Sequence, residues 1–374
     1  MTRITVTQPL LPPLAEFAPL LERIWDSRIL TNAGPLHEEL EHALCARLGV
    51  PYLSLFANAT IALMTAVQVL GLKGDVITTP FSFVAGAHAL RRQHVHPVFV
   101  DVDPQTLNID PARVEAAITP RTTGILAVHC YGTPCDTAAL HCIADRHGLQ
   151  LLYDAAHAFG ITVGGESVLR QGHLSVLSFH ATKVFSTFEG GAIVSHDAAT
   201  KARIDRLRNF GITDEVTVDE VGLNGKMSEI HAAFGLLQLR YIDAAIVRRA
   251  QIAEQYQVAL GELPGIDQLP TGSQDAPNHS YFPVRVRAPY PLSRDALYDA
   301  FRQQGIYARR YFYPLISDLG AYRAFAPAEP DALPVAAAAA REILCLPMHP
   351  GLTDADVTAV LAVMQRGATA VPQR

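Results

Sequence analysis

The sequence is poor in cysteine and contains no paired cysteine motif. Only five of its 374 residues are cysteine, at positions 45, 130, 135, 142 and 345, and no two of them form a C-x-x-C pair. An odd number of unpaired cysteines argues against both a disulfide framework and a zinc knuckle. We therefore expect free thiols, no metal site and a cytoplasmic protein.

The sequence also lacks any block of like charge. It has 30 basic and 36 acidic residues, which gives a formal net charge of −6. Non-specific binding to nucleic acid requires a basic stripe that displaces counterions, and anionic membrane surfaces also select basic patches. We expect neither nucleic acid nor a membrane as a partner.

No segment has the pattern of a signal peptide, because the N-terminus lacks a basic region followed by an apolar stretch. Residues 50–72 are uncharged over a length that could mimic a membrane span. Pro51, Asn58, Thr60 and Gln68 interrupt this segment, however, and divide it into a strand, a turn and a helix. Polar groups of this kind are costly in lipid, so we expect a globular segment.

Two common phosphate-binding motifs are absent as well. No G-x-G-x-x-G follows a predicted strand, and no Walker-type loop occurs. The first absence makes a nicotinamide-dependent dehydrogenase the weakest of the enzymatic hypotheses.

What the sequence does contain is a regular alternation of short apolar runs and helical patterns. This alternation predicts βα units and a mostly parallel sheet, and the length suggests two or three structural units. The predicted strands are 76–79, 98–102, 124–129, 149–153, 176–179, 192–194 and 281–286, with helices at 111–118 and 137–147. One long helix is predicted over 227–260, with Ser228 as its N-cap and a domain boundary near residue 240. The expected domains are therefore 1–240 and 241–374.

Three features lie at the ends of predicted strands, where open α/β sheets bind their ligands. The first is Asn58-Ala59-Thr60, which begins a helix whose free N–H groups suit a phosphate. The second is Asp154, a carboxylate directly after a buried strand, which needs a cationic partner. The third is Lys183 in a phenylalanine-rich loop, where desolvation lowers the pKa of the amine. Ser178, five residues earlier, adds a hydroxyl for a phosphate.

Each feature taken alone has a simpler explanation. Asn58 or Thr60 could serve only as a helix cap, Asp154 could cap a turn, and Lys183 could lie at the surface. The combination is more specific, because pyridoxal 5'-phosphate (PLP) requires a phosphate cradle, an acid for its ring nitrogen and a lysine for its aldehyde. The order of the three motifs therefore predicts a PLP site.

Five segments together resemble the successive motifs of the DegT/DnrJ/EryC1/StrS family of sugar aminotransferases. They are residues 58–60 (NAT), 78–83 (TTPFSF), 153–157 (YDAAH), 178–183 (SFHATK) and 222–229 (GLNGKMSE). The resemblance extends from about Leu30 to Pro350. It implies an α/β fold of PLP fold type I, in which helices flank a large mixed, mostly parallel sheet and a smaller α+β domain follows at the C-terminus.

The resemblance also implies roles for individual residues. Lys183 would bond to the cofactor and act as the acid and base, while Asp154 would pair with the ring nitrogen. Phe83 would stack on the ring, and His157, where many relatives have Gln, would lie near the phenolic oxygen. The cofactor phosphate would be held by three residues of one subunit and by an asparagine of its neighbour, which implies a homodimer with shared active sites: Ala59, Thr60 and Ser178, with Asn224 from the other chain.

Within the family, residues 29–35, 128–132 and 179–191 are most similar to enzymes that aminate dTDP-4-keto-6-deoxy-D-glucose at C4. Those enzymes take the amino group from L-glutamate and release 2-oxoglutarate. Lys183 argues against the branch that dehydrates sugars and has histidine there. The open alternatives are amination of a 3-keto sugar, a UDP- or GDP-linked substrate, and a regulator that binds PLP without turnover.

Two further features have no settled role. Phe188 stands where many family members have Gly, and we expect it to narrow the sugar pocket. The cluster Arg309-Arg310-Tyr311-Phe312-Tyr313 is a candidate for binding the donor carboxylate or the nucleotide, because Arg forms paired hydrogen bonds with carboxylates and phosphates. Packing in the core is the alternative for its aromatic residues.

Overall fold

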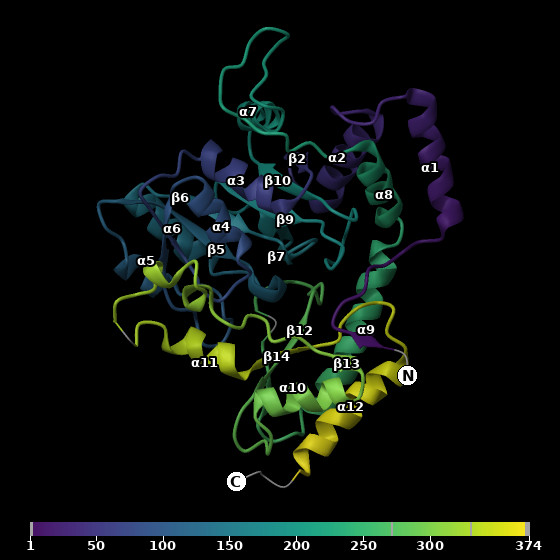
Figure 1. Ribbon diagram of the computed structural model, residues 1–374, viewed down its shortest axis with the longest axis vertical. Coiled ribbons are helices and arrows are strands. Elements are labelled where there is room, and N and C mark those ends of the chain that lie inside the picture. Colours follow the sequence, from purple (N-terminus) through teal and green to yellow (C-terminus); the bar gives the residue numbers. More distant parts are fainter. Residues whose placement is uncertain (1–2, 271, 330, 371–374) are drawn as a thin grey trace.

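The computed structural model describes residues 3–270, 272–329 and 331–370. Its main feature is a seven-stranded sheet in the order β2-β10-β9-β6-β5-β3-β4. Figure 1 shows this sheet in the upper part of the view. β10 is antiparallel to both of its neighbours, and the remaining pairs are parallel. The α/β prediction is confirmed. The strands are β2 (Tyr52–Phe56), β3 (Asp75–Thr78), β4 (His96–Phe99), β5 (Thr122–Val128), β6 (Gln150–Asp154), β9 (Leu174–Ser178) and β10 (Gly191–Ser195).

Alternate residues of the central strands face opposite sides of this sheet. Leu126 and Leu152 pack with the helices on one face, and Ile125 and Leu151 pack with those on the other. Both faces are buried, as is usual for parallel sheets, and this explains the continuous apolar runs in the sequence. The first face carries α3 (Ala59–Val69), α4 (Ala85–Arg92) and α7 (Ala198–Arg208), and the second carries α5 (Pro111–Ala116) and α6 (Thr137–His147).

A third helical group covers the β2 edge of the sheet. It comprises α1 (Leu14–Ser27), α2 (Pro35–Leu48) and α8 (Glu229–Leu239), which share one apolar core. The buried carboxylate of Glu229 accepts hydrogen bonds from the N–H groups of Leu36 (2.9 Å) and His37 (2.8 Å). Glu229 therefore provides hydrogen-bond acceptors for two free N–H groups at the N-terminus of α2, and this contact holds α8 against α2.

The single helix predicted over 227–260 is wrong, because the chain breaks at residues 240–241. α8 and α9 (Ile242–Leu260) meet at an angle of 60°. α8 packs on the large sheet, whereas α9 belongs to a separate core, so the two helices bury their apolar faces in different directions. Ser228 occupies the N-cap position, but its hydroxyl contacts His231 Nδ1 (2.7 Å) and caps no backbone N–H.

The second core surrounds a small antiparallel sheet in the lower part of Figure 1. Its strands are β11 (Ile266–Gln268), β12 (Phe282–Val286) and β14 (Ile343–Leu346), and its helices are α9, α10 (Arg294–Gln303) and α12 (Asp354–Ala368). The N-terminal β1 (Ile4–Thr5) pairs with β13 (Ile306–Tyr307) beside this unit. We propose the α8–α9 break as the boundary between domains 1–240 and 241–374.

A short hairpin and one further helix complete the set of strands and α-helices in the described residues. β7 (Thr162–Val163) and β8 (Glu166–Ser167) form a small hairpin. α11 (Pro334–Glu342) is tied to the large sheet by Asp101, whose carboxylate accepts from the N–H groups of Val335 (2.9 Å) and Ala336 (2.8 Å). Asp101 thus links the segment before β14 to the end of β4.

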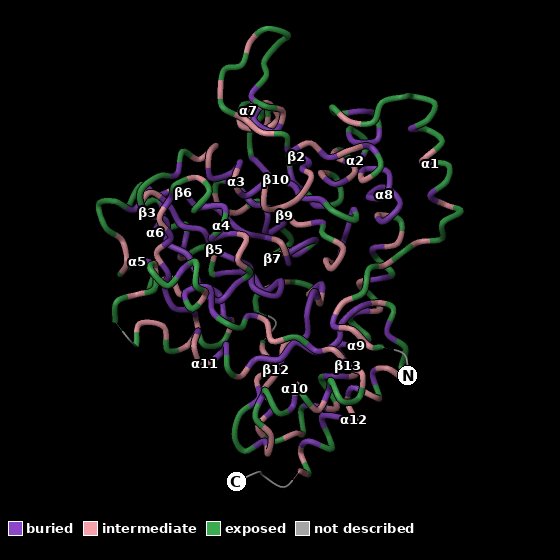
Figure 2. The backbone as a smooth tube through the Cα atoms, in the orientation of Figure 1, coloured by how far each residue is buried: buried purple, intermediate pink, exposed green. Residues whose placement is uncertain are grey.

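The loop between α7 and α8 projects away from the sheet (Figure 1) and is mostly exposed (Figure 2). Antiparallel bridges join Asn209 to Asn224 and Ile212 to Val218, so the segment folds back on itself.

Within the described residues, no single helix is long and apolar enough to cross a membrane; α8 and α9 pass that test only as a bent pair.

Candidate active site

A cavity of about 360 Å³ lies at the carboxyl ends of β6 and β9, between the large sheet and residues of the C-terminal half. This is the position where α/β sheets bind ligands, and the volume is typical of a small-molecule site. Seven of the eight predicted site residues line this cavity: Ala59, Thr60, Phe83, Asp154, His157, Ser178 and Lys183. The eighth, Asn224, lies on the projecting loop.

One end of the cavity is formed by the N-terminus of α3. Asn58 is the N-cap, and its side chain accepts from Ile61 N–H (3.0 Å), as the simpler explanation of this motif predicts. Ala59 and Thr60 of the first turn also line the cavity, as does Ser178 at the end of β9. Free N–H groups and the positive end of the helix dipole make this end suited to a phosphate.

Gly191 makes the close packing at this helix start possible. A Cβ at position 191 would lie only 2.6 Å from Ala59 N and 2.7 Å from the carbonyl carbon of Asn58. β10 therefore passes directly against the first turn of α3, and any side chain at position 191 would push that turn away.

Asp154 ends β6 and is only 6% exposed. Its Oδ1 accepts from Ala156 N–H (3.0 Å). Burial raises the pKa of this carboxyl group, and the Ala156 N–H and the nearby Lys183 lower it. A cation placed beside this buried carboxyl group in the cavity would stabilise its ionised form.

Lys183 lies in the loop that joins β9 to β10, and its backbone N–H donates to His180 O (2.9 Å). Desolvation lowers the pKa of its amine to about 8, and Asp154 opposes this shift. The chain has only four lysines. Lys201 donates to Glu41 and Asp205, Lys226 donates to Asn209, and Lys73 is exposed. Lys183 is the lysine that lines this cavity.

His157 is held by a segment that precedes β12. Its carbonyl oxygen accepts from Asn278 Nδ2 (2.9 Å) and Ser280 Oγ (2.8 Å), and its ring contacts the edge of Tyr281, with ring centroids 4.9 Å apart. Burial lowers the pKa of His157 well below its usual value, so the ring is neutral. Its Nδ1 is buried without a partner in the structure.

Asn278, Ser280 and Tyr281 were not predicted from the sequence. They are separated from His157 by more than 120 residues, and no local pattern connects the two segments. The only available signal was their position at the predicted strand 281–286, since Asn278 and Ser280 precede it and Tyr281 is its first residue.

The cluster at residues 309–313 is divided between two locations. Arg309, Tyr311 and Phe312 line the cavity, whereas Arg310 forms an ion pair with Asp295 (2.9 Å). Phe312 also stacks on His157 at a centroid distance of 6.2 Å. His180 and Glu189 also line the cavity, with His180 Nε2 3.6 Å from Glu189 Oε1. Neither residue was predicted from the sequence as a site residue.

Phe188 does not line this cavity, so the structure gives no support to the expectation that it narrows the pocket. Its ring stacks on Phe234 at a centroid distance of 3.9 Å and meets the edge of Phe17. Its backbone is left-handed, with φ of 64°, which is the conformation that glycine adopts easily. The ring of Phe188, which is 39% exposed, therefore packs at the surface against α1 and α8.

The residues of the cavity fit PLP. The α3 N-terminus and Ser178 suit its phosphate, buried Asp154 suits a protonated ring nitrogen, and the Lys183 amine suits its aldehyde. Within the described residues, no group of three or more His, Cys, Asp or Glu is placed to hold a metal ion.

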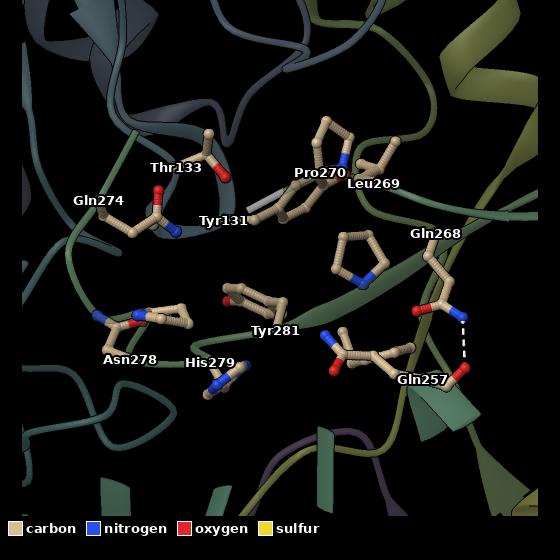
Figure 3. A pocket seen from close by; sticks show the side chains of 14 residues that line it. Tyr131, Thr133, Gln257, Gln268, Leu269, Pro270, Gln274, Asn278, His279 and Tyr281 are labelled. Carbon is tan, nitrogen blue, oxygen red and sulfur yellow. Dashed lines mark hydrogen bonds between the residues drawn. The ribbon is translucent and has the colours of Figure 1, made fainter. Parts of the chain in front are cut away.

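A second cavity, of about 60 Å³, lies on another side of Tyr281 (Figure 3). Tyr131, Gln257, Gln274 and His279 are among the residues around it. It is too small for a phosphorylated ring, and it contains none of the predicted site residues.

Comparison with known proteins gives several close matches. The chain is 55% identical over 350 residues to the dTDP-4-amino-4,6-dideoxy-D-glucose transaminase of Shigella dysenteriae, covering 94% of this chain and 95% of the relative. It is 49% identical over 362 residues to the enzyme of the same name from Escherichia coli, covering 96% of this chain and 98% of that relative. The solved structure of DesI in the presence of its TDP-sugar product has a TM-score of 0.94 at 37% identity, covering 99% of this chain and 94% of that one.

The match to the family model covers nearly the whole chain, from residue 14 to residue 365. It includes both cores and every residue that lines the cavity. The chain belongs to the DegT/DnrJ/EryC1/StrS aminotransferase family.

Proposed function

We propose that this aminotransferase moves the amino group of L-glutamate to C4 of dTDP-4-keto-6-deoxy-D-glucose. The products are 2-oxoglutarate and dTDP-4-amino-4,6-dideoxy-D-glucose. The observation that carries the proposal is the placement of Lys183 and Asp154 in one cavity beside the α3 N-terminus. The names of the relatives with 55% and 49% identity support the choice of substrate.

When bound, PLP provides an electron sink and carries the amino group between the two substrates. We assign Asp154 to keep the proton on the ring nitrogen and Lys183 to move a proton at the carbon that carries nitrogen. Ala59, Thr60 and Ser178 would hold the phosphate, Phe83 would cover the ring, and neutral His157 would lie near its phenolic oxygen.

The substrate assignment is tested with a panel of keto sugars. The enzyme is incubated with glutamate and with dTDP-, UDP- or GDP-linked 3-keto and 4-keto sugars, and NMR locates the new nitrogen. We expect fastest transfer to C4 of the dTDP-linked sugar. Faster amination at C3 or of another nucleotide sugar would contradict the assignment, and a coloured protein that transfers nothing would instead indicate a regulator.

We also propose that the enzyme is a homodimer in which Asn224 of one chain reaches the phosphate of the other. Asn224 does not line the cavity of its own chain in the part that the structure describes. Its loop carries Val216 and Val221, which are 92% and 87% exposed and would be buried by a partner. A mixture of Lys183→Ala and Asn224→Ala chains tests this proposal. Regained activity in the mixture would support active sites shared between the two chains, and a mixture that stays inactive would contradict them.

The proposed compartment is the cytoplasm. The five cysteines are free thiols, and three of them, Cys130, Cys135 and Cys345, are buried. Free thiols of this number are typical of a reducing environment.

A further inference from the structure

Residues 278–281, which we call the support segment, hold His157 in the wall of the larger cavity. The side chains of Asn278 and Ser280 donate to His157 O, and the edge of the Tyr281 ring meets the imidazole. Close packing does not surround this segment. Asn278, His279 and Tyr281 line the cavity of about 60 Å³ (Figure 3), and Tyr281 also lines the larger cavity. Hydrogen bonds must therefore help to fix its position.

The backbone of the support segment is in an uncommon conformation at His279. Its φ is 48°, in the left-handed region that residues other than glycine seldom adopt. Such a conformation costs free energy and persists where surrounding contacts hold it. The His279 carbonyl oxygen accepts from Arg249 Nη1 (3.0 Å), and the same nitrogen donates to Met348 O (2.9 Å), two residues beyond β14. Arg249 thus ties the support segment to the chain after β14.

Arg249 is a buried cation without an acidic partner. It is 2% exposed on α9, and burial lowers its pKa to about 10, so the guanidinium is charged at neutral pH. Arg208 and Arg294 are the other buried arginines among the described residues, and both form ion pairs, whereas Arg249 forms none there. Tyr281 influences Arg249, but burial raises the pKa of its phenol, which stays neutral. An unpaired buried charge is costly, so stability alone does not explain this arginine.

We propose that Arg249 is a positioning residue for His157, because it fixes the support segment and thereby the place of the imidazole in the larger cavity. This inference rests on the proposed function, in which His157 lies near the phenolic oxygen of PLP. Arg249 is not among the described residues that line this cavity, so it acts through the His279 carbonyl. A guanidinium suits this task, since one of its nitrogens has two hydrogens and can hold two carbonyl groups at once.

The test is the rate at which bound PLP dissociates, followed by absorbance during dialysis. Arg249→Met removes the donors but keeps a long unbranched side chain, and we expect dissociation about tenfold faster, because hydrogen bonds from a charged donor are lost. Arg249→Lys keeps the charge and one donor group, and an intermediate rate is expected. Tyr256→Phe is the matched control and should dissociate PLP at the wild-type rate. Tyr256 is buried on the same helix and donates to Pro347 O (3.0 Å), next to Met348.

A double variant separates positioning from a general loss of stability. His157→Ala should itself speed PLP dissociation, and adding Arg249→Met should change that rate by less than about twofold, because both changes act on one contact. The absorbance maximum of bound PLP should shift in the same direction in both single variants and stay unchanged in Tyr256→Phe.

Two results would overturn the inference alone: wild-type PLP dissociation in Arg249→Met, or a full further acceleration in the double variant. Wild-type dissociation in His157→Ala would contradict the role that the proposed function gives to His157, and the inference would fall with it. A wild-type enzyme that transfers no amino group from glutamate to any sugar nucleotide would overturn the proposed function, and the coupling between Arg249 and His157 would still be measurable.

Discussion

Lys183 shows how one residue obtains its reactivity from its surroundings. Its amine reacts with an aldehyde only when it is neutral, and desolvation lowers its pKa from 10.5 to about 8. At pH 7 most of the amine is still protonated in the apoenzyme, and above pH 8 most of it is neutral. The amine that is proposed to form the covalent bond therefore titrates about one pH unit above neutral pH, well below an ordinary lysine.

The first prediction concerns this titration. The rate at which the apoenzyme captures PLP is expected to rise with pH and to level off above about pH 8, because the neutral amine increases over that range. Stopped-flow absorbance in the visible range measures the rate. A profile that still rises steeply at pH 10 would indicate an amine with its ordinary pKa.

The second prediction concerns Asp154. Burial raises its pKa, so its ionised form destabilises the apoenzyme at neutral pH. Asp154→Asn keeps the shape and can still accept from Ala156 N–H, and we expect a higher melting temperature of the apoenzyme at pH 7. The difference should shrink as the pH falls and the wild-type carboxyl group becomes protonated.

The same substitution is expected to slow amino transfer by at least 100-fold, because the ring nitrogen loses its anionic partner. Differential scanning calorimetry and the rate of 2-oxoglutarate release measure the two effects. Equal activity of Asp154→Asn and the wild type would remove Asp154 from the mechanism.

At the scale of elements, the contact between β10 and the start of α3 shapes the phosphate end of the site. In Gly191→Ala, the new Cβ would lie 2.6 Å from Ala59 N, so the first turn of α3 must move. We expect PLP to dissociate at least tenfold faster during dialysis. Gly49→Ala is the matched control: its φ of +63° costs about 1 kcal/mol, but no atom lies within 4 Å, so cofactor retention should not change.

The segment before β12 offers a second prediction at this scale. Asn278 donates to the carbonyl groups of both His157 (2.9 Å) and Phe159 (3.0 Å). Asn278→Ala removes both bonds and should cost about 2 kcal/mol of the free energy of unfolding. Urea denaturation measures this loss, and Ser280→Ala should cost less, because Asn278 still holds the His157 carbonyl. A larger loss in Ser280→Ala would contradict the account.

Some features of the helices and strands could be predicted from the sequence, and others could not. Asp154 could be predicted because a polar residue directly after an apolar run is visible locally, and Lys183 because it stands in a phenylalanine-rich loop that follows a predicted strand. The break between α8 and α9 contains neither Pro nor Gly. It arises because the two helices pack on different cores, and this tertiary cause leaves no local signal. The contact of Asn278 with His157 was missed for the same reason.

At the scale of the whole molecule, the projecting loop between α7 and α8 is the part that a single chain does not explain. The family resemblance predicted that Asn224 acts from a neighbouring chain, and composition alone gave no hint of this. The exposure of apolar side chains on this loop is visible only in the structure.

Replacement of Val216 and Val221 by Ser should therefore weaken a dimer without destabilising the chain, since both side chains are almost fully exposed. We expect a larger monomer fraction by light scattering and a loss of activity in proportion. Val258→Ser on α9, which is 74% exposed, is the control and should leave the dimer intact. An unchanged dimer in the double variant would place the interface elsewhere.

The central claim is that PLP bonds to Lys183 in this cavity. Reduction of the PLP-loaded enzyme with borohydride, followed by peptide mass spectrometry, tests it directly, because the chain has only four lysines. The account predicts one pyridoxyl group per chain, on Lys183, and none in Lys183→Ala. A label on Lys73, Lys201 or Lys226, or no stable label at all, would contradict it.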